Sequence, residues 1–364
     1  MTDSDTSNEL QQQVLEALRY LTPLTIVGGG SKSFLGRTTG RAQPVETGKH
    51  RGIVEYDPRE LVLTARSGTP LSEIEAALNQ AGQMLAFEPP HFGPIGTLDA
   101  TLGGTIACGL SGPRRPYSGS ARDFVLGCRM LNGRGEILRF GGQVMKNVAG
   151  YDVSRLMAGA YGTLGVMLEL SLKVLPRPPA SITVTHECSA AEAISSMSAL
   201  LGKPYPVDAA CYHGGSCHVR ISGSEQGVKE ARMKIPGDAL ADADTFWHAL
   251  REHQLPFFER SSTLYRIVVK PATPPLEIAG SWLLDWGGAQ RWLYSEEDAE
   301  AIRHRVAGIG GHVTVFRRGA QTEETSQPQI FQPLSGPLLA IHQRLKAGFD
   351  PKTLFNRGRF YENL

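Results

Sequence analysis

"TLGGTIACGLSGPRRPYSG", residues 101–119, is the stretch that decides the fold of this chain. Its first ten residues are mostly small, and two adjacent arginines, Arg114 and Arg115, follow a few positions later. Glycine has no side chain to keep a ligand away from the backbone, whereas arginine carries a permanent charge that binds anions. The stretch therefore predicts a large anionic ligand lying against the backbone. An arginine pair on an ordinary surface turn is the alternative interpretation.

The chain around this stretch is rich in glycine, since 16 of the 41 glycines fall between residues 93 and 165. Such density favours either a backbone in contact with a ligand or a loop-rich β region with many turns. The 37 Lys and Arg residues nearly balance the 36 Asp and Glu residues. Bulk charge therefore gives no support to a nucleic-acid-binding protein.

Five cysteines are present, at positions 108, 128, 188, 211 and 217, and none of them forms a CxxC motif. An odd number without that motif is typical of a reduced, cytosolic protein, and it offers no ligand set for an iron–sulfur cluster. The sequence contains no run of about 18 apolar residues, the length that a membrane-spanning helix needs, so no membrane span is predicted. The N-terminus also lacks the pattern of a signal peptide.

Hydrophobic periodicity predicts helices and hairpins along the whole chain. Thr69 is expected to cap the second helix, and Asp152 is expected to cap a short helix that stops at Gly159. This mixture favours the α+β class over a doubly wound parallel sheet. Helices are expected at residues 8–21, 69–82, 189–202, 224–235, 242–254 and 296–307, and hairpins at 121–142, 207–223 and 281–295.

The run "IVGGGSKSFLG", residues 26–36, follows an expected strand. It is a poor dinucleotide fingerprint because Ser33 replaces the third glycine and no amphipathic helix follows. It is not a Walker A loop either, because Ser31 separates Gly30 from Lys32. The remaining interpretation is a nest of backbone N–H groups that cradles a phosphate, with serine and lysine side chains as further donors.

Two further segments are candidates for ligand contact. The small residues of "TLGGTIACGL" predict a short helix whose N-terminus, with Gly103 and Gly104, lets a pyrophosphate approach the backbone. In residues 141–166, a turn with Lys146 and Asn147 precedes a helix, and "GTLG" leads into a strand. The edge of that strand is expected to pair with an adenine or a ribose. Ordinary turn and cap chemistry is the alternative.

Taken in order, "VGGGSKSFLG", "TLGGTIACGLSGPRRPYSG", "VMKNVAGYD" and "AYGTLGV" resemble the flavin-binding domain of the vanillyl-alcohol-oxidase and para-cresol-methylhydroxylase (PCMH) type. In the second half, "FWHALREHQLPFF", "GGAQRWL" and the closing "FNRGRFY" resemble the E-type subunits of bacterial glycolate oxidase (glycolate dehydrogenase) complexes. The resemblance implies an α+β fold. It divides the chain into a two-subdomain PCMH-type FAD-binding domain (residues 1–179), a smaller mixed α+β cap domain (180–319), and a C-terminal helix and tail (320–364) that return to the flavin domain.

The resemblance also implies a function in glycolate catabolism. The chain would be a flavoprotein subunit of a heteromeric oxidoreductase that oxidises glycolate, a 2-hydroxy acid, to glyoxylate. Its partners would be a sister FAD subunit and an iron–sulfur subunit that receives the electrons. The location would be cytoplasmic, with the partner subunits able to hold the chain at the inner face of the membrane. Two alternatives stay open: a free-standing FAD-dependent hydroxy-acid or alcohol oxidoreductase, and a non-catalytic scaffold with a flavin fold.

FAD is expected to bind without a covalent bond, because the first loop contains neither His nor Cys. The chain lacks the His-x-Gly-Asp-Gly-Asn-x-His segment of related hydroxy-acid-oxidising chains, so no catalytic residue is assigned. The expected cofactor-binding residues are Gly28, Gly29, Gly30, Ser31, Lys32, Ser33, Gly96, Thr97, Leu98, Gly103, Gly104, Ala107, Ser111, Gly112, Arg114, Arg115, Gly119, Lys146, Asn147, Gly162, Thr163, Gly165, Val166, Asn356 and Gly358.

The hairpin "CYHGGSCHV" suggests a metal site at first sight, because Cys211, His213 and His218 share one face of it. Three ligands from one tight hairpin give poor tetrahedral geometry, so ordinary hairpin packing is predicted and no metal is expected. His91, in "EPPHFGP", has two interpretations, a base beside the flavin and a solvated histidine in a loop. The solvated loop histidine is favoured.

Overall fold

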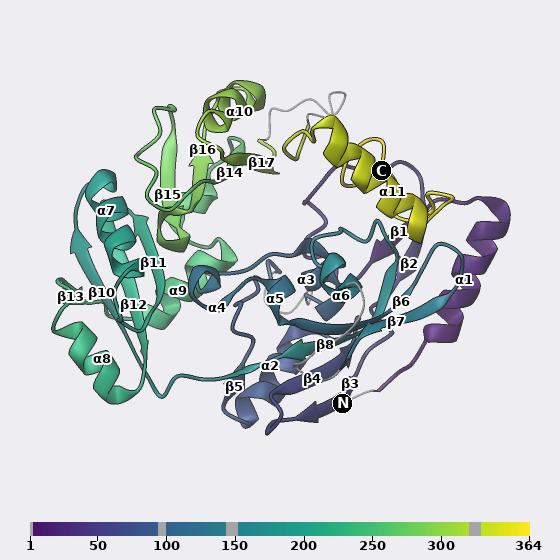
Figure 1. Cartoon of the computed structure of the whole chain (residues 1–364), viewed down its shortest axis with the longest axis horizontal. Coiled ribbons are helices and arrows are strands. Elements are labelled where there is room, and N and C mark those ends of the chain that lie inside the picture. The colour runs from purple at the N-terminus through teal and green to yellow at the C-terminus, as the bar shows by residue number, and fades with distance from the viewer. Residues whose placement is uncertain (1–2, 94–99, 143–151, 320–328) are drawn as a thin grey trace. The chain divides into compact units, whose positions relative to one another are not determined.

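The computed structural model describes residues 3–93, 100–142, 152–319 and 329–364 (Figure 1). The chain forms two compact units, each built from more than one segment. The first unit contains Met1–Leu110, Ser120–Pro176 and Pro333–Leu364, and the second contains Ser111–Gly119 and Arg177–Gln332. From the sequence, the boundary is expected after residue 179, with residues 111–119 inside the first domain. Here the division follows Pro176, and the nine residues from Ser111 to Gly119 belong to the second unit.

A five-stranded antiparallel sheet, in the order β3-β4-β8-β6-β7, forms the centre of the first unit. The middle strand reads VMLELSLK and is almost wholly buried, as expected for a strand covered on both faces. Apolar residues of α2 and α3 pack on this sheet in one core cluster. The strands are β3 (Ile53–Asp57), β4 (Val62–Arg66), β6 (Val125–Leu131), β7 (Ile137–Gly141) and β8 (Val166–Lys173), and the helices are α2 (Leu71–Gln80), α3 (Leu102–Cys108), α5 (Ala121–Phe124) and α6 (Val153–Leu156).

A second core cluster of the first unit lies under its N-terminal helix, α1 (Ser7–Tyr20). Leu10 and Val14 on the apolar face of this helix pack with Leu24 of β1 (Leu24–Val27) and with Phe355 of the C-terminal tail. The strand β1 pairs in parallel with β2 (Gln43–Glu46), and its first residue bridges Phe355. The helix α11 (Gly336–Phe349) precedes this tail, and the short strands β5 (Gln83–Met84) and β9 (Leu175–Pro176) pair with each other.

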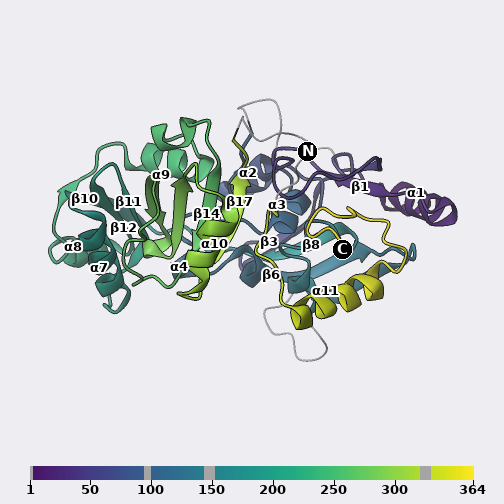
Figure 2. The ribbon, with the colours of Figure 1, turned by 90° about the horizontal axis from the view of Figure 1, so that it is seen from above.

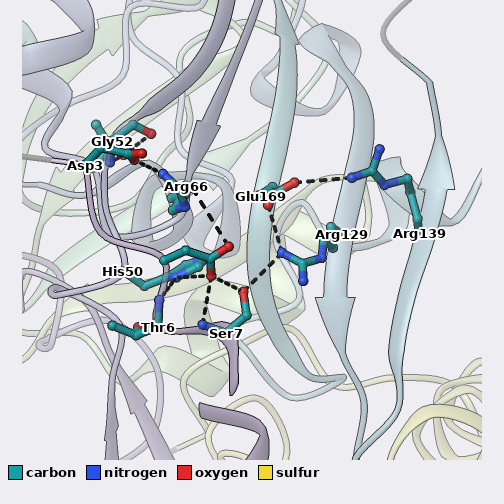
Figure 3. Close-up of polar contacts among 11 residues, drawn as sticks. Asp3, Thr6, Ser7, His50, Gly52, Arg66, Arg129, Arg139 and Glu169 are labelled. Atoms are coloured by element: carbon teal, nitrogen blue, oxygen red, sulfur yellow. Dashed lines mark hydrogen bonds and ion pairs between the residues drawn. The ribbon is translucent and has the colours of Figure 1, made fainter. Parts of the chain in front are cut away.

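Polar contacts fix the residues before α1 onto the sheet (Figure 3). Arg129 of β6 donates to Ser7 Oγ (3.0 Å) and to the carboxylate of Glu169 (2.8 Å) on β8. Asp3 forms an ion pair with Arg66 at the end of β4. Asp3 and Ser7 are therefore joined directly to β4 and β6, and Arg129 links this contact to β8.

The second unit is built on an eight-stranded antiparallel sheet in the order β13-β10-β12-β11-β15-β16-β14-β17. The strands are β10 (Ala180–Glu187), β11 (Val207–His213), β12 (Ser216–Gly223), β13 (Asp238–Ala239), β14 (Leu264–Val268), β15 (Ser281–Asp285), β16 (Gln290–Tyr294) and β17 (His312–Arg317). The helices are α4 (Arg115–Ser118), α7 (Ala190–Leu201), α8 (Glu225–Arg232), α9 (Ala243–Glu252), α10 (Ala299–Ala307) and the 3-10 turns η1 (Pro256–Glu259) and η2 (Trp286–Gly288).

Helices cover both faces of the β10–β12 part of this sheet (Figure 2). Val184 packs with the apolar residues of α7 and α8. Thr183, one position earlier and so on the opposite face, accepts a hydrogen bond from Trp247 Nε1 of α9 (2.8 Å). A capping box starts α7, in which Ser189 and Glu192 satisfy each other's backbone N–H groups. Local signals in the sequence therefore account for where this helix begins.

Most expected helices and hairpins occur where the sequence predicts them, but two details differ. Thr69 does not cap α2, because its hydroxyl instead accepts the Gly52 N–H (2.9 Å) and Pro70 holds the cap position. The strand after "GTLG" is also not a free edge. Strand β8 pairs with β6 from Val166 onward and with β4 from Glu169 onward, so only its first residues are unpaired on the β4 side.

Candidate cofactor site

A cavity of about 170 Å³ lies within the first unit. Its walls come from β1 and the loop after it, from the ends of strands, from α3, from the loop before β8, and from the C-terminal tail. The lining residues are Thr25, Ile26, Val27, Gly28, Gly29, Gly30, Ser31, Lys32, Ser33, Thr47, Ser67, Thr101, Gly103, Gly104, Ala107, Cys108, Tyr161, Gly162, Gly165, Met167, Asn356 and Arg359. Segments from both ends of the chain therefore meet around one small volume.

The glycine run after β1 approaches α3 very closely. A Cβ atom at Gly28 would lie 2.4 Å from Oγ1 of Thr101, the residue that caps α3, so only glycine fits there. The Gly30 carbonyl accepts the Ser33 N–H (3.0 Å) and turns the loop. Among the described residues, the N–H groups of Gly28, Gly29 and Gly30 meet no acceptor. Successive N–H groups of this kind are what a phosphate nest requires.

The start of α3 contributes close packing, not N–H donors. The Gly103 N–H donates to the Ser67 carbonyl (2.7 Å), and the Gly104 N–H donates to Thr101 Oγ1 (3.3 Å). The N–H groups of Gly103 and Gly104 are therefore used within the protein, both residues line the cavity, and the approach of a pyrophosphate to this helix N-terminus stays a prediction. The Gly103 N–H thus joins the first turn of α3 to Ser67, the residue that follows β4, and the Gly104 N–H bonds to the cap residue of its own helix.

Two cations line the cavity, and no Asp or Glu is among its described lining residues. The buried Lys32 ammonium lies 3.3 Å from the His91 carbonyl and 3.4 Å from Ser31 Oγ. Arg359 Nη2 donates to the Ser33 carbonyl (2.7 Å). Burial raises the pKa of the Cys108 thiol, and the charges of Lys32 and Arg359 oppose that rise, so both cations act on the same thiol. The cavity therefore attracts an anion.

A buried hydroxyl also marks the cavity as a polar site. Ser67 is 2% exposed, and its Oγ has no hydrogen-bond partner within residues 3–93, 100–142, 152–319 and 329–364. A buried polar group without a partner costs about 1–3 kcal/mol. Because Ser67 lines the cavity, a polar ligand there would satisfy it. The glycine nest, the cations and this hydroxyl together fit a ligand that carries phosphates.

The C-terminal tail closes one side of the cavity through Asn356. Its N–H donates to the Leu24 carbonyl (2.8 Å), and its Oδ1 accepts the Ile26 N–H (2.9 Å). Its Nδ2 donates to the Tyr161 carbonyl (2.6 Å). The side chain thus joins β1 to the loop before β8. The sequence analysis expected Asn356 at the flavin domain, and the contacts give it a positioning role there.

A buried ion pair fixes the same tail. Lys346 Nζ donates to the Asp350 carboxylate (2.8 Å), to the Phe355 carbonyl (2.8 Å) and to the Thr163 carbonyl (2.7 Å). Asp350 in turn accepts the Phe355 N–H (2.8 Å). The sequence analysis missed this pair, although Lys and Asp four positions apart at the end of an expected helix are a usable signal. The pair connects α11 to two walls of the cavity.

The expected cofactor-binding residues fall into four groups. Those that line the cavity are Gly28, Gly29, Gly30, Ser31, Lys32, Ser33, Gly103, Gly104, Ala107, Gly162, Gly165 and Asn356. Those in the first unit but not in the lining are Thr163, Val166 and Gly358. Those outside the described residues are Gly96, Thr97, Leu98, Lys146 and Asn147. Those in the second unit are Ser111, Gly112, Arg114, Arg115 and Gly119. Residues that line the cavity without having been expected include Ser67, Thr101, Tyr161 and Arg359.

The arginine pair that opened the sequence analysis has partners within the second unit. Arg114 Nη2 lies 2.5 Å from the Asp208 carboxylate, whose other oxygen lies 2.6 Å from Arg220 Nε. The Arg115 guanidinium lies 4.3 Å from the centre of the Trp286 ring. The indole of this tryptophan donates to the carbonyl of Gly112 (2.9 Å). The contact of these arginines with a cofactor stays a prediction.

The other candidate groups have ordinary surroundings. Cys211 and His218 face each other across the β11–β12 hairpin, and both are buried. Burial raises the pKa of the Cys211 thiol and lowers the pKa of His218 to about 4, so both pack as neutral groups. In the described part of the chain no three His, Cys, Asp or Glu residues are grouped as a metal site. His91 lies 3.3 Å from Glu75 and is not a cavity-lining residue.

Comparison with known proteins agrees with this geometry. Residues 4–141 match the family described as FAD binding domain. The glycolate oxidase subunit GlcE of Escherichia coli (strain K12) is 50% identical over 365 residues, which cover 100% of both chains. The glycolate oxidase subunit GlcD of Bacillus subtilis (strain 168) is 30% identical over 179 residues, which cover 49% of this chain and 37% of that protein.

Among solved structures, an alkyldihydroxyacetonephosphate synthase shares the fold, with a TM-score of 0.66 and 16% identity over 95% of this chain and 74% of that chain. The expected α+β class and PCMH-type FAD-binding fold are confirmed, as is the expected FAD cofactor. The chain belongs to the family of the glycolate oxidase subunit GlcE, and its first unit contains an FAD binding domain.

Proposed function

We propose that this protein is an FAD-binding subunit of a glycolate oxidase-type complex that oxidises glycolate to glyoxylate. The observation that carries the proposal is a cavity that holds two cations, a glycine nest and no described carboxylate, in a chain 50% identical to GlcE over its whole length. FAD, when bound, supplies the acceptor for a hydride from the carbon of a 2-hydroxy acid.

The chain's own residues bind and orient the cofactor. The loop Gly28–Ser33 offers N–H groups to its phosphates, with Lys32 as the nearest cation of that loop. Gly103, Gly104 and Ala107 form a close wall of α3, and Asn356 holds the tail against β1. Cys108 is the one thiol in the described lining, and burial raises its pKa, which favours the neutral form. The proposed binding is therefore non-covalent.

The remaining expected cofactor-binding residues stay in the proposal. Thr163, Val166 and Gly358 adjoin lining residues in the chain, and the segments around Gly96 and Lys146 belong to the set expected from the sequence. Ser111, Gly112, Arg114, Arg115 and Gly119 also stay predicted cofactor contacts.

The proposed partners are a sister FAD subunit and an iron–sulfur subunit that carries the electrons onward. The family supports this arrangement, because its members are named as subunits and GlcD matches about half of this chain. The proposed location is the cytoplasm, with the partners able to hold the complex at the inner face of the membrane. Among the residues that the structure describes, none of the helices has the length and apolar character to cross a bilayer.

The test is a spectrum of the purified full-length chain before and after heat or acid. We expect bound FAD that is released by either treatment, and no bleaching by glycolate until the partner subunits are added. Bleaching of the isolated chain by glycolate would identify a free-standing enzyme. A chain that neither contains nor takes up FAD would be a scaffold and would overturn the proposal.

A further inference from the structure

Arg359 lies in the C-terminal tail, and the sequence analysis gave it no role. We propose that Arg359 binds the diphosphate of the bound dinucleotide, so that the tail supplies one wall of the anion site. This inference rests on the proposed binding of FAD, and it assigns a residue far from the glycine loop to the same phosphates.

The position of Arg359 is fixed from both ends of the residue. Its carbonyl accepts the Arg37 N–H (2.9 Å), and its guanidinium Nη2 donates to the Ser33 carbonyl (2.7 Å). Gly36 leaves the room for this, since a Cβ atom there would lie 2.9 Å from the Arg359 carbonyl oxygen and 3.2 Å from its Nε. The loop that follows the glycine run therefore holds the guanidinium in place. A binding group that is already in place loses little conformational entropy when a ligand arrives.

The charge of Arg359 lacks a carboxylate partner among the described residues. Burial lowers the pKa of its guanidinium, and the groups that oppose this are Cys108 and Tyr161, neither of which is a carboxylate. A partly buried cation without a counter-charge is unfavourable, because charges inside proteins are normally paired. An anionic ligand in the cavity would provide the missing counter-charge.

The available donors fit two adjacent phosphates. A guanidinium has five N–H donors in a planar fork, and the Ser33 carbonyl is the one acceptor found for Arg359 within the described residues. Ser33 ends the loop whose glycine N–H groups form the nest, so Arg359 and the nest line the same cavity. The lysine of this loop, Lys32, acts on the same thiol as Arg359. A diphosphate can receive bonds from the fork and from the nest together.

The test compares Arg359→Gln with Arg357→Gln in the full-length chain after its flavin has been removed. Arg357 is an exposed residue of the same tail, so its substitution removes the same charge without touching the cavity. Dissociation constants are measured by calorimetry for FAD, for ADP and for riboflavin, which carries no phosphate. We expect R359Q to bind FAD and ADP about 10- to 100-fold more weakly and riboflavin unchanged, and R357Q to match the wild type.

A second variant guards against misfolding. Arg359→Lys keeps the charge but loses the fork, and we expect a loss of FAD affinity of about 3- to 10-fold with an unchanged melting temperature. An R359Q chain that binds FAD like the wild type would overturn the inference and leave the proposed function standing. An equal loss for riboflavin and FAD would also overturn it, since Arg359 would then only support the loop. A wild-type chain that binds no FAD would overturn both.

Discussion

Two groups of cationic side chains, one in each unit, have opposite surroundings. In the first unit, Lys32 and Arg359 line a cavity whose described lining holds no carboxylate. In the second unit, Arg114 and Arg220 share the buried carboxylate of Asp208 at 2.5 and 2.6 Å. The difference teaches that the surroundings of a cationic side chain, and not its residue type, decide whether a carboxylate of the protein already balances its charge.

Arg114 of the sequence pair Arg114–Arg115 is thus paired with a carboxylate. Arg115 adds a cation–π contact with Trp286, and Arg220 adds one with Trp247 (5.1 Å from the ring centre). The Arg114–Asp208 and Arg115–Trp286 contacts join Ser111–Gly119 to the second unit, although the residues on either side of this segment in sequence belong to the first. The comparison between the cations of the first unit and those of the second can be tested by fluorescence. All four tryptophans of the chain lie in the second unit, so their fluorescence reports on the unfolding of that unit.

The largest effect is expected from Asp208→Asn. Removing this charge takes away the carboxylate that two nearly buried guanidiniums share, so the free energy of unfolding should fall by about 3–5 kcal/mol. Urea unfolding followed by tryptophan fluorescence measures this fall in stability. Asp238→Asn, at an exposed position of the same sheet, is the control. A D208N chain as stable as the control would mean that the cluster is not structural.

A smaller effect is expected from acid acting on the strand that carries Arg220. Burial, the largest cause, lowers the pKa of His218 on β12 to about 4 from the ordinary value of 6.5. Between pH 6.5 and 4 the unfolded chain binds a proton at this residue and the folded chain does not. Stability is therefore complete above pH 6.5 and falls by about 1.4 kcal/mol per pH unit as the pH drops toward 4.

Unfolding free energies of His218→Gln between pH 4 and 7 test this. In His218→Gln, the unfolding free energy should change less steeply with pH, by the contribution of one bound proton. His304→Gln, at an exposed histidine of the same unit, is the control and should show the wild-type dependence. Identical slopes for H218Q and the wild type would show that His218 binds its proton equally well in the folded and the unfolded chain, which would contradict the lowered pKa.

The smallest effect on the fold, and a clear effect on binding, is expected from Lys32→Gln. Because Lys32 is a cation of the cavity, FAD affinity should fall by about 10- to 100-fold, while the thermal unfolding of the chain, followed by circular dichroism, stays unchanged. Titration of the flavin-free chain with FAD measures the affinity. Lys49→Gln, at an exposed position of the same unit, should bind FAD like the wild type. The contrast between Lys32 and Arg359 in the first unit and Arg114 and Arg220 in the second would be contradicted if K32Q changed the stability of the chain but not its affinity for FAD.

Local patterns in the sequence were enough for most elements. The apolar spacing of α1 and the capping box of α7 depend only on neighbouring residues. Strand β2 was missed because QPVE is short and mostly exposed, and it is a strand only through its parallel pairing with β1. Thr69 was assigned to a cap because the sequence does not show that Gly52 lies beside it.

By itself, the sequence determined the helices, the hairpins, the glycine loop and the family of the chain, because each of these depends on residues that are close together in the sequence. The tertiary structure alone decided which charges are paired. It placed Asp208 beside Arg114, and it brought Arg359 to Ser33 across 326 positions of the chain. Electrostatic energy depends on distance in space and on burial, and neither quantity can be read from the order of the residues.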